Sequence, residues 1–151
     1  MRMKTTVAFC AFLLLALAPC AAQRTIESMK AEADAAQGGQ RAKLYAQLAD
    51  TLVGVASQQF SQDDDQAGQA TVQDILKYTA QAREICLRTR DKMKATEILL
   101  RSTQRKLNSL KHTLGVDDRP AVDKVEKQVE QYRQDILEAM FAPPKKDKEK
   151  K

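Results

Sequence analysis

The segment from residue 75 to residue 114, ILKYTAQAREICLRTRDKMKATEILLRSTQRKLNSLKHTL, decides the fold. Mainly apolar residues recur along it with alternating spacings of four and three. This alternation is typical of a helix that packs against other helices through one face. We call the set the heptad seam; it consists of Ile75, Thr79, Ala82, Cys86, Thr89, Met93, Thr96, Leu100, Thr103, Leu107, Leu110 and Leu114.

The surrounding sequence predicts three further helices, over about residues 25–37, 40–61 and 119–141. Gly38-Gly39 separates the first two, and Asp118 is a suitable N-cap for the last. Helix-forming residues dominate throughout, and no segment alternates apolar and polar residues with a period of two. The sequence therefore predicts an all-α protein.

The heptad seam itself favours one long central helix over about residues 65–114. After Gly68, no glycine or proline occurs before Gly115, and a helix of that length would span roughly 75 Å. The helix over 40–61 would fold back on its first half and the helix over 119–141 on its second half. The expected architecture is a pair of antiparallel helical hairpins that share one long central helix, with three to four helices and coiled-coil-like packing.

A break near Thr89 is the alternative. No apolar residue lies between Leu87 and Met93, so a turn there would let the two hairpins close into a four-helix bundle. We favour the straight helix because the heptad phase continues through the junction without a stutter. A straight molecule would leave apolar surface on each hairpin, which favours a homodimer.

The first 22 residues have the order of a secretory signal peptide. Arg2 and Lys4 are followed by an apolar run over residues 7–18 and then by small residues that end at Ala22. The apolar run is too short for a spanning helix, which needs about 20 residues. The sequence therefore predicts an exported protein, periplasmic or extracellular, that is cleaved after Ala22.

Cleavage would leave a single helical domain over residues 23–142 and a Lys-rich, disordered tail over 143–151. Cys20 supports an alternative, because Leu17-Ala18-Pro19-Cys20 resembles a bacterial lipoprotein box in which the cysteine is lipidated. Proline directly before the cysteine departs from that pattern. A lipid-anchored envelope protein is therefore the alternative location.

The basic isoelectric point of 9.2 arises at the two ends of the chain. Of the 25 lysines and arginines, two lie in the signal segment and five in the tail, whereas two of the 20 acids lie in the tail. Residues 23–144 thus carry 18 of each sign. No basic excess remains for a nucleic-acid-binding face, and membrane contact is expected only through a lipidated Cys20 or weakly through the lysine tail.

An acidic run is the first candidate for chemistry. Asp63, Asp65, Gly68 and Asp74 match positions one, three, six and twelve of a calcium-binding loop. However, Ala67 stands at position five, where an oxygen ligand is required, and position twelve lacks the bidentate glutamate. We interpret the aspartates as caps for the following helix.

The other candidates receive structural interpretations. Cys86 lies on the heptad seam and is interpreted as core, and His112 has no second ligand nearby. Thr79, Thr89, Thr96 and Thr103 are interpreted as methyl-bearing seam residues. Paired carboxylates, a phosphate-binding loop and a Ser-His-Asp spacing are absent. We therefore predict no catalytic residue, no cofactor-binding residue and no metal ligand, and we expect no enzyme.

The chain resembles known classes of protein in two respects. The stretch from Leu48-Ala49 through Phe60 to Asp63-Asp64-Asp65-Gln66-Ala67 resembles one tetratricopeptide-type hairpin, without a second copy. As a whole, the chain is similar to small exported helical proteins of bacteria. It also resembles helical periplasmic stress chaperones in size and context, although their LTxxQ motif is replaced here by LRSTQ at residues 100–104.

These observations predict a non-catalytic, exported scaffold or adaptor that acts through helix–helix contacts, either with a protein partner or with a second copy of itself. The alternative is a periplasmic holdase-like chaperone that offers an apolar helical face to unfolded chains. A third hypothesis is a bundle that binds a small ligand or metal.

Overall fold

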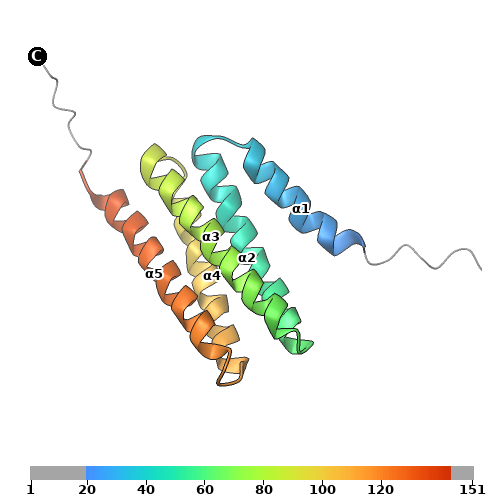
Figure 1. Cartoon of the computed structure of the whole chain (residues 1–151). Helices are drawn as coiled ribbons and strands as arrows, with labels where there is room; N and C mark the ends of the chain where they lie inside the picture. The colour runs from blue at the N-terminus through green and yellow to red at the C-terminus, as the bar shows by residue number, and fades with distance from the viewer. Residues whose placement is uncertain (1–19, 144–151) are drawn as a thin grey trace, which may run out of the picture.

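The computed structural model describes the backbone of residues 20–143 and the side chains of residues 26–143. In this part of the chain the structure is all-helical, which confirms the predicted all-α class (Figure 1). The elements, in chain order, are α1 (Cys20–Ala35), α2 (Gly38–Ser61), α3 (Asp65–Thr89), α4 (Met93–Thr113) and α5 (Arg119–Phe141).

Helices α2 to α5 form a four-helix bundle of two antiparallel hairpins (Figure 1). Within the hairpins, α2 pairs with α3 and α4 pairs with α5. Between the hairpins, α2 packs beside α4 and α3 packs beside α5, whereas α3 and α4 lie diagonally across the core. Because consecutive helices run in opposite directions, the neighbours from different hairpins run parallel to each other.

The straight central helix over residues 65–114 that the heptad phase favours is wrong. Helix α3 ends at Thr89 and α4 begins at Met93, so the alternative of a break near Thr89 is the observed one. Arg90 and Lys92 both adopt the left-handed conformation with φ of 54°. Each costs about 1 kcal/mol relative to glycine, and together they reverse the chain within three residues.

Contacts on both sides hold this α3–α4 corner in place. The side chain of Asp91 accepts a hydrogen bond of 2.7 Å from the backbone N–H of Lys92, and the guanidinium of Arg90 donates to the carbonyl oxygen of Ala139 at the end of α5. Gly39 lies so close to the corner that a Cβ at residue 39 would approach the backbone of Asp91 to 2.6 Å. The corner therefore docks directly on the start of α2.

The heptad seam forms the centre of the bundle. All of its members are buried except Thr89 at the corner. Bundle closure buries the apolar faces of both hairpins, which a straight molecule would leave half exposed. Among the described residues, the exposed large hydrophobic side chains are only Ile98, Val116 and Phe141. The apolar surface that motivated the homodimer prediction is thus covered within one chain.

Helix α1 is an appendage to the bundle and contacts only α2. The hydroxyl of Tyr45 donates a hydrogen bond of 2.6 Å to the carboxylate of Asp34, and the guanidinium of Arg41 donates to the carbonyl oxygen of Ala33 at 3.3 Å. The buried side chain of Ala33 completes this contact. Polar contacts near the end of α1 thus hold it against α2.

Several predicted boundaries shift or lie outside the described residues. Helix α1 begins at Cys20 rather than near residue 25, and α2 begins at Gly38. The carboxylate of Asp118 makes no cap of α5 and instead accepts a hydrogen bond of 2.6 Å from the side chain of Gln69. The predicted signal segment over 1–22 lies mostly outside the described residues, as does almost all of the predicted tail over 143–151.

Candidate functional site

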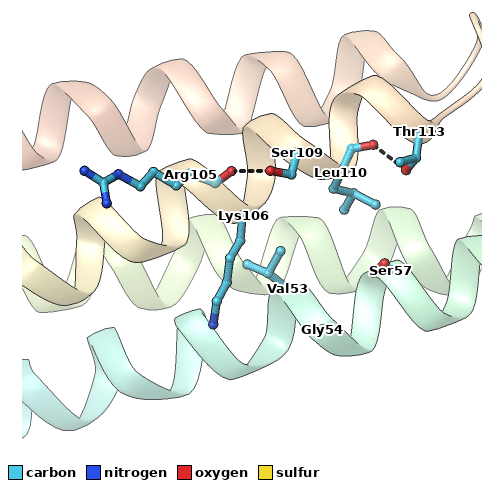
Figure 2. A pocket seen from close by; sticks show the side chains of 8 residues that line it. All are labelled: Val53, Gly54, Ser57, Arg105, Lys106, Ser109, Leu110 and Thr113. Carbon is cyan, nitrogen blue, oxygen red and sulfur yellow. Dashed lines mark hydrogen bonds between the residues drawn. The ribbon is translucent and has the colours of Figure 1, made fainter.

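A groove of about 390 Å³ runs along the bundle surface between α2 and α4 (Figure 2). These helices belong to different hairpins, so the groove exists only because the hairpins close on each other. The residues that line it are Val53, Gly54 and Ser57 of α2 and Arg105, Lys106, Ser109, Leu110 and Thr113 of α4.

The lining of the groove is more apolar than its composition indicates. Its floor is formed by the branched apolar side chains of Val53 and Leu110 (Figure 2), which belong to the core and are 3% and 5% exposed. The hydroxyls of Ser109 and Thr113 donate hydrogen bonds of 3.1 and 2.8 Å to carbonyl oxygens one turn earlier in α4. Because these donors are already used, they offer a ligand little beyond carbon atoms and acceptor lone pairs.

Gly54 keeps the groove open on the α2 side. A Cβ placed on this residue would meet no atom within 4 Å. Glycine in the middle of a helix destabilises the helix by roughly 0.5–1 kcal/mol relative to alanine. Neither the backbone conformation nor a close contact requires a glycine here, and its lack of a side chain leaves this side of the groove open.

The α4 side of the groove is strongly basic. Helix α4 contains five lysines and arginines and one acid, Glu97, which is a net charge of +4. The even balance of charge over residues 23–144 thus conceals a local excess. Lys106 pairs across one end of the groove with the carboxylate of Asp50 at 2.7 Å, so that this cation is compensated by α2.

Arg105 has no compensating carboxylate. Its side chain is exposed and, among the described residues, forms neither an ion pair nor a hydrogen bond. Figure 2 shows the guanidinium extended along α4 away from the groove floor. Arg105 also lines a second, polar depression between α4 and α5, so its charge is available to a ligand over either groove.

The polar depression is built on a half-buried network of charges. Glu97 is 3% exposed and accepts two hydrogen bonds of 2.8 Å and one of 3.1 Å from Arg101. The guanidinium of Arg133 lies 4.0 Å from the same carboxylate, and its Nε is buried without a hydrogen-bond partner. Arg101 of α4 and Arg133 of α5 thus share one buried carboxylate.

The acidic candidates gather at one end of the bundle but do not form a calcium loop. Asp64 caps α3 by accepting a hydrogen bond of 3.2 Å from the backbone N–H of Ala67, as interpreted from the sequence. Asp74 lies nine residues further along α3, or about 13 Å from Asp65 at 1.5 Å per residue. Within the described residues, no group of three or more potential ligands is placed to hold a metal ion.

Gly68 has a packing role instead of a turn role. It lies inside α3, and a Cβ there would approach the ring of Phe60 to 2.8 Å.

The turn that follows α4 adds Asp118 to this end of the bundle. Repulsion from Asp118, followed by burial and by Asp63 and Asp64, raises the pKa of Asp65. This end is therefore a region of mutual repulsion between carboxylates.

The remaining candidates lie apart from the groove. Cys86 is buried beside the α3–α4 corner, with its Sγ 3.8 Å from the carbonyl oxygen of Asp91, and burial raises the pKa of its thiol. His112 is exposed in the last turn of α4, at the other end of that helix. The hydroxyl of Thr103 donates to the carbonyl oxygen of Leu99 at 3.0 Å, which leaves its methyl group for the core.

No sequence pattern assigns a role to the residues that make the groove. Gly54 is a glycine within a helical pattern, and Arg105 contributes only to the total charge. The one signal present is the concentration of basic residues between 101 and 111. The net charge of residues 23–144 conceals this signal, because acidic residues elsewhere in that range balance it.

No family model, curated protein or solved structure matches this chain. The resemblances to a tetratricopeptide-type hairpin and to exported bacterial helical proteins therefore stay predictions. None of the helices within residues 20–143 has the length and hydrophobicity required to cross a bilayer.

Proposed function

We propose that this protein is a non-catalytic, exported adaptor that binds an acidic amphipathic helix of a partner protein in the α2–α4 groove. The observation that carries the proposal is the combination of an apolar groove, open at Gly54, with the unpaired guanidinium of Arg105 on its rim. Export is supported by the order of charged, apolar and small residues before Gln23.

The shape and chemistry of the groove favour a helix as the ligand. Two parallel helices border it, and a third helix can place its apolar side chains between them, as amphipathic helices do in other grooves. The exposed edges of the largely buried Val53 and Leu110 would contact the apolar face of such a helix. Acidic side chains on its flank would then lie over Arg105 and the other cations of α4.

The charge of α4 favours a protein over a nucleic acid. Lys106, Lys111 and Arg101 are already paired with carboxylates of this chain. Among the lysines and arginines of α4, only Lys94 and Arg105 remain unpaired. Two free cations are too few for the several phosphate contacts of a nucleic-acid-binding face, whereas Arg105 alone, on the rim of the groove, can orient one acidic helix.

Fluorescence anisotropy with a synthetic peptide tests the proposal. The probe is a labelled helical peptide of about 18 residues, or five turns, with leucines on one face and glutamates along its flanks. A control peptide has lysines in place of the glutamates. We expect the acidic peptide to bind at least about tenfold more tightly, because complementary charges set the choice between partners.

Three variants locate the binding site. Gly54→Leu directs a side chain toward the groove from a position where a Cβ meets no atom within 4 Å, and Arg105→Glu reverses the free charge. Each variant is expected to weaken binding about tenfold or more. Lys94→Glu makes the same charge reversal on the same helix outside the groove, and we expect less than about threefold weakening. Equal binding of both peptides, or unchanged binding to Gly54→Leu, would refute the proposal.

An aggregation assay separates the adaptor from the holdase-like chaperone. A holdase offers a broad apolar surface, so its suppression of client aggregation should survive Gly54→Leu, which closes one groove. Suppression by the wild type that persists in this variant would favour the chaperone alternative. Absence of suppression together with peptide binding would favour the adaptor.

A further inference from the structure

The heptad seam keeps its phase across the α3–α4 corner. Cys86, Thr89, Met93 and Thr96 follow each other at spacings of three, four and three, although the chain reverses direction between the second and the third. If residues 90–92 became helical, every seam residue would lie on one face of a single helix. The same core residues thus suit both a hairpin corner and a straight helix.

The corner has a strained backbone at two residues whose types rarely adopt that conformation. Arg90 and Lys92 are left-handed, and neither is glycine or asparagine, the residues that usually adopt this conformation at helix ends. Residues 89–92 are all exposed. Opening the corner would release the strain without taking a side chain of these residues out of the core.

The packing between the hairpins does not require that both belong to one chain. Helix α2 packs on α4 and α3 packs on α5, and the only covalent link between these pairs is the corner. Two open chains related by a twofold axis could exchange hairpins and restore both packing interfaces twice. Only the interactions of the corner would be broken, such as the hydrogen bond from Arg90 to Ala139.

We propose that a second copy of this chain docks on the hairpin interface by domain swapping. In the swapped dimer, α3 and α4 form one helix over residues 65–113, which spans roughly 75 Å. Each end of the dimer is a four-helix bundle built from two chains. Each bundle retains an α2–α4 groove, so the dimer presents two grooves on one rigid rod. The proposal does not depend on what the groove binds.

Two matched variants of the corner test the swap by light scattering and small-angle X-ray scattering after refolding at high concentration. In the first, Arg90, Asp91 and Lys92 are all replaced by alanine, which favours a continuous helix. In the second, Arg90→Gly and Lys92→Gly relieve the left-handed strain and disfavour a helix. In a helix, alanine is favoured over glycine by about fivefold per residue, so the monomer–dimer equilibria of the two variants should differ, with the alanine variant shifted toward the dimer and the glycine variant toward the monomer.

Exchange between chains identifies a swapped dimer directly. One batch of the alanine variant carries a donor dye at Ser57→Cys on α2, and another carries an acceptor at Ser109→Cys on α4; both positions line the same groove (Figure 2). After the mixture is refolded, energy transfer between chains is expected because the groove is then built from two chains. The same dyes in the glycine variant should show no transfer.

The expected result is a dimer of the alanine variant with a maximum dimension of at least about 75 Å, from the helix rise, and with transfer between chains. A monomeric alanine variant with wild-type dimensions would overturn the proposal. A dimer without transfer would also overturn it, because the hairpins would then remain within their own chains.

Discussion

Gly39 and Gly54 lie on the same helix, but replacement by alanine should change the stability of the protein in opposite directions at the two positions. At Gly39, a Cβ would come within 2.6 Å of the carbonyl carbon and oxygen of Asp91, which belong to the backbone of the α3–α4 corner. The corner must shift to admit it, and overpacking of this kind costs about 1–3 kcal/mol. We therefore expect Gly39→Ala to destabilise the protein by that amount.

At Gly54, the added methyl group meets no atom within 4 Å, and alanine is the better helix former. Gly54→Ala should therefore stabilise the protein by about 0.5–1 kcal/mol. The difference between the two variants is about 1.5–4 kcal/mol. For a domain of this size, 1 kcal/mol shifts the thermal midpoint by roughly 3–5 °C, so the variants should differ by several degrees.

Urea unfolding followed by circular dichroism measures both free energies of unfolding. The comparison also tests the bundle closure, because a straight central helix would place residue 91 away from α2 and remove the conflict at Gly39. Gly39→Ala as stable as the wild type would therefore refute the docking of the corner on α2. A clear loss of stability in Gly54→Ala would contradict the open groove.

Three further predictions concern single ionisable groups. Hydrogen bonds from Lys127 and Lys111 lower the pKa of Asp123 to about 2. The ionised Asp123 therefore stabilises the fold above the ordinary pKa of 3.8, and this stabilisation is lost as pH falls toward 2. In the variant Lys111→Met, carboxyl NMR titration should show the pKa of Asp123 moving back upward. Asp118→Asn should lower the raised pKa of Asp65. Because a raised carboxyl pKa destabilises the fold as pH rises, the urea midpoint of the variant should increase at about pH 7 and not at about pH 3. An equal increase at both pH values would contradict repulsion between Asp118 and Asp65. Cys86 is buried with a raised thiol pKa, so alkylation mapped by mass spectrometry should be slow in the folded protein and fast in urea; fast alkylation of the folded protein would show that the corner opens readily.

The helices and the core are predictable from the sequence because helical periodicity is a local signal. The heptad seam identifies buried positions from Ile75 to Leu114, and all but Thr89 are buried in the bundle. Each seam residue faces a neighbouring helix whether the chain is straight or folded back. Burial can therefore be predicted without knowledge of which helix provides the contact.

The connection between α3 and α4 is not predictable from the same signal. A three-residue corner preserves the alternation of three and four, so the unbroken phase that favours a straight helix is compatible with both structures. The polar run at residues 88–91 is the only positive sign of a break. The strain at Arg90 and Lys92 is also invisible in the sequence, because neither residue type favours a left-handed conformation.

The candidate site could not be predicted because it is made between hairpins. Val53 and Leu110 are 57 residues apart and face the same groove only after the bundle closes. Arg105 is one of many arginines in the sequence, and its distinguishing property is the lack of a carboxylate nearby. That property depends on which acids the fold brings to α4, such as Asp50 beside Lys106.

The pairing of neighbours in the chain also determines how this protein folds. The helices of each hairpin are joined by short turns, so α2–α3 and α4–α5 can each assemble through local contacts before they meet. Helical bundles with such low contact order fold within about microseconds to milliseconds. Helix α1 contacts only α2 and takes no part in the packing between the two hairpins. Local opening should accordingly begin at α1, whose amide hydrogens should exchange with solvent before those of α2 to α5.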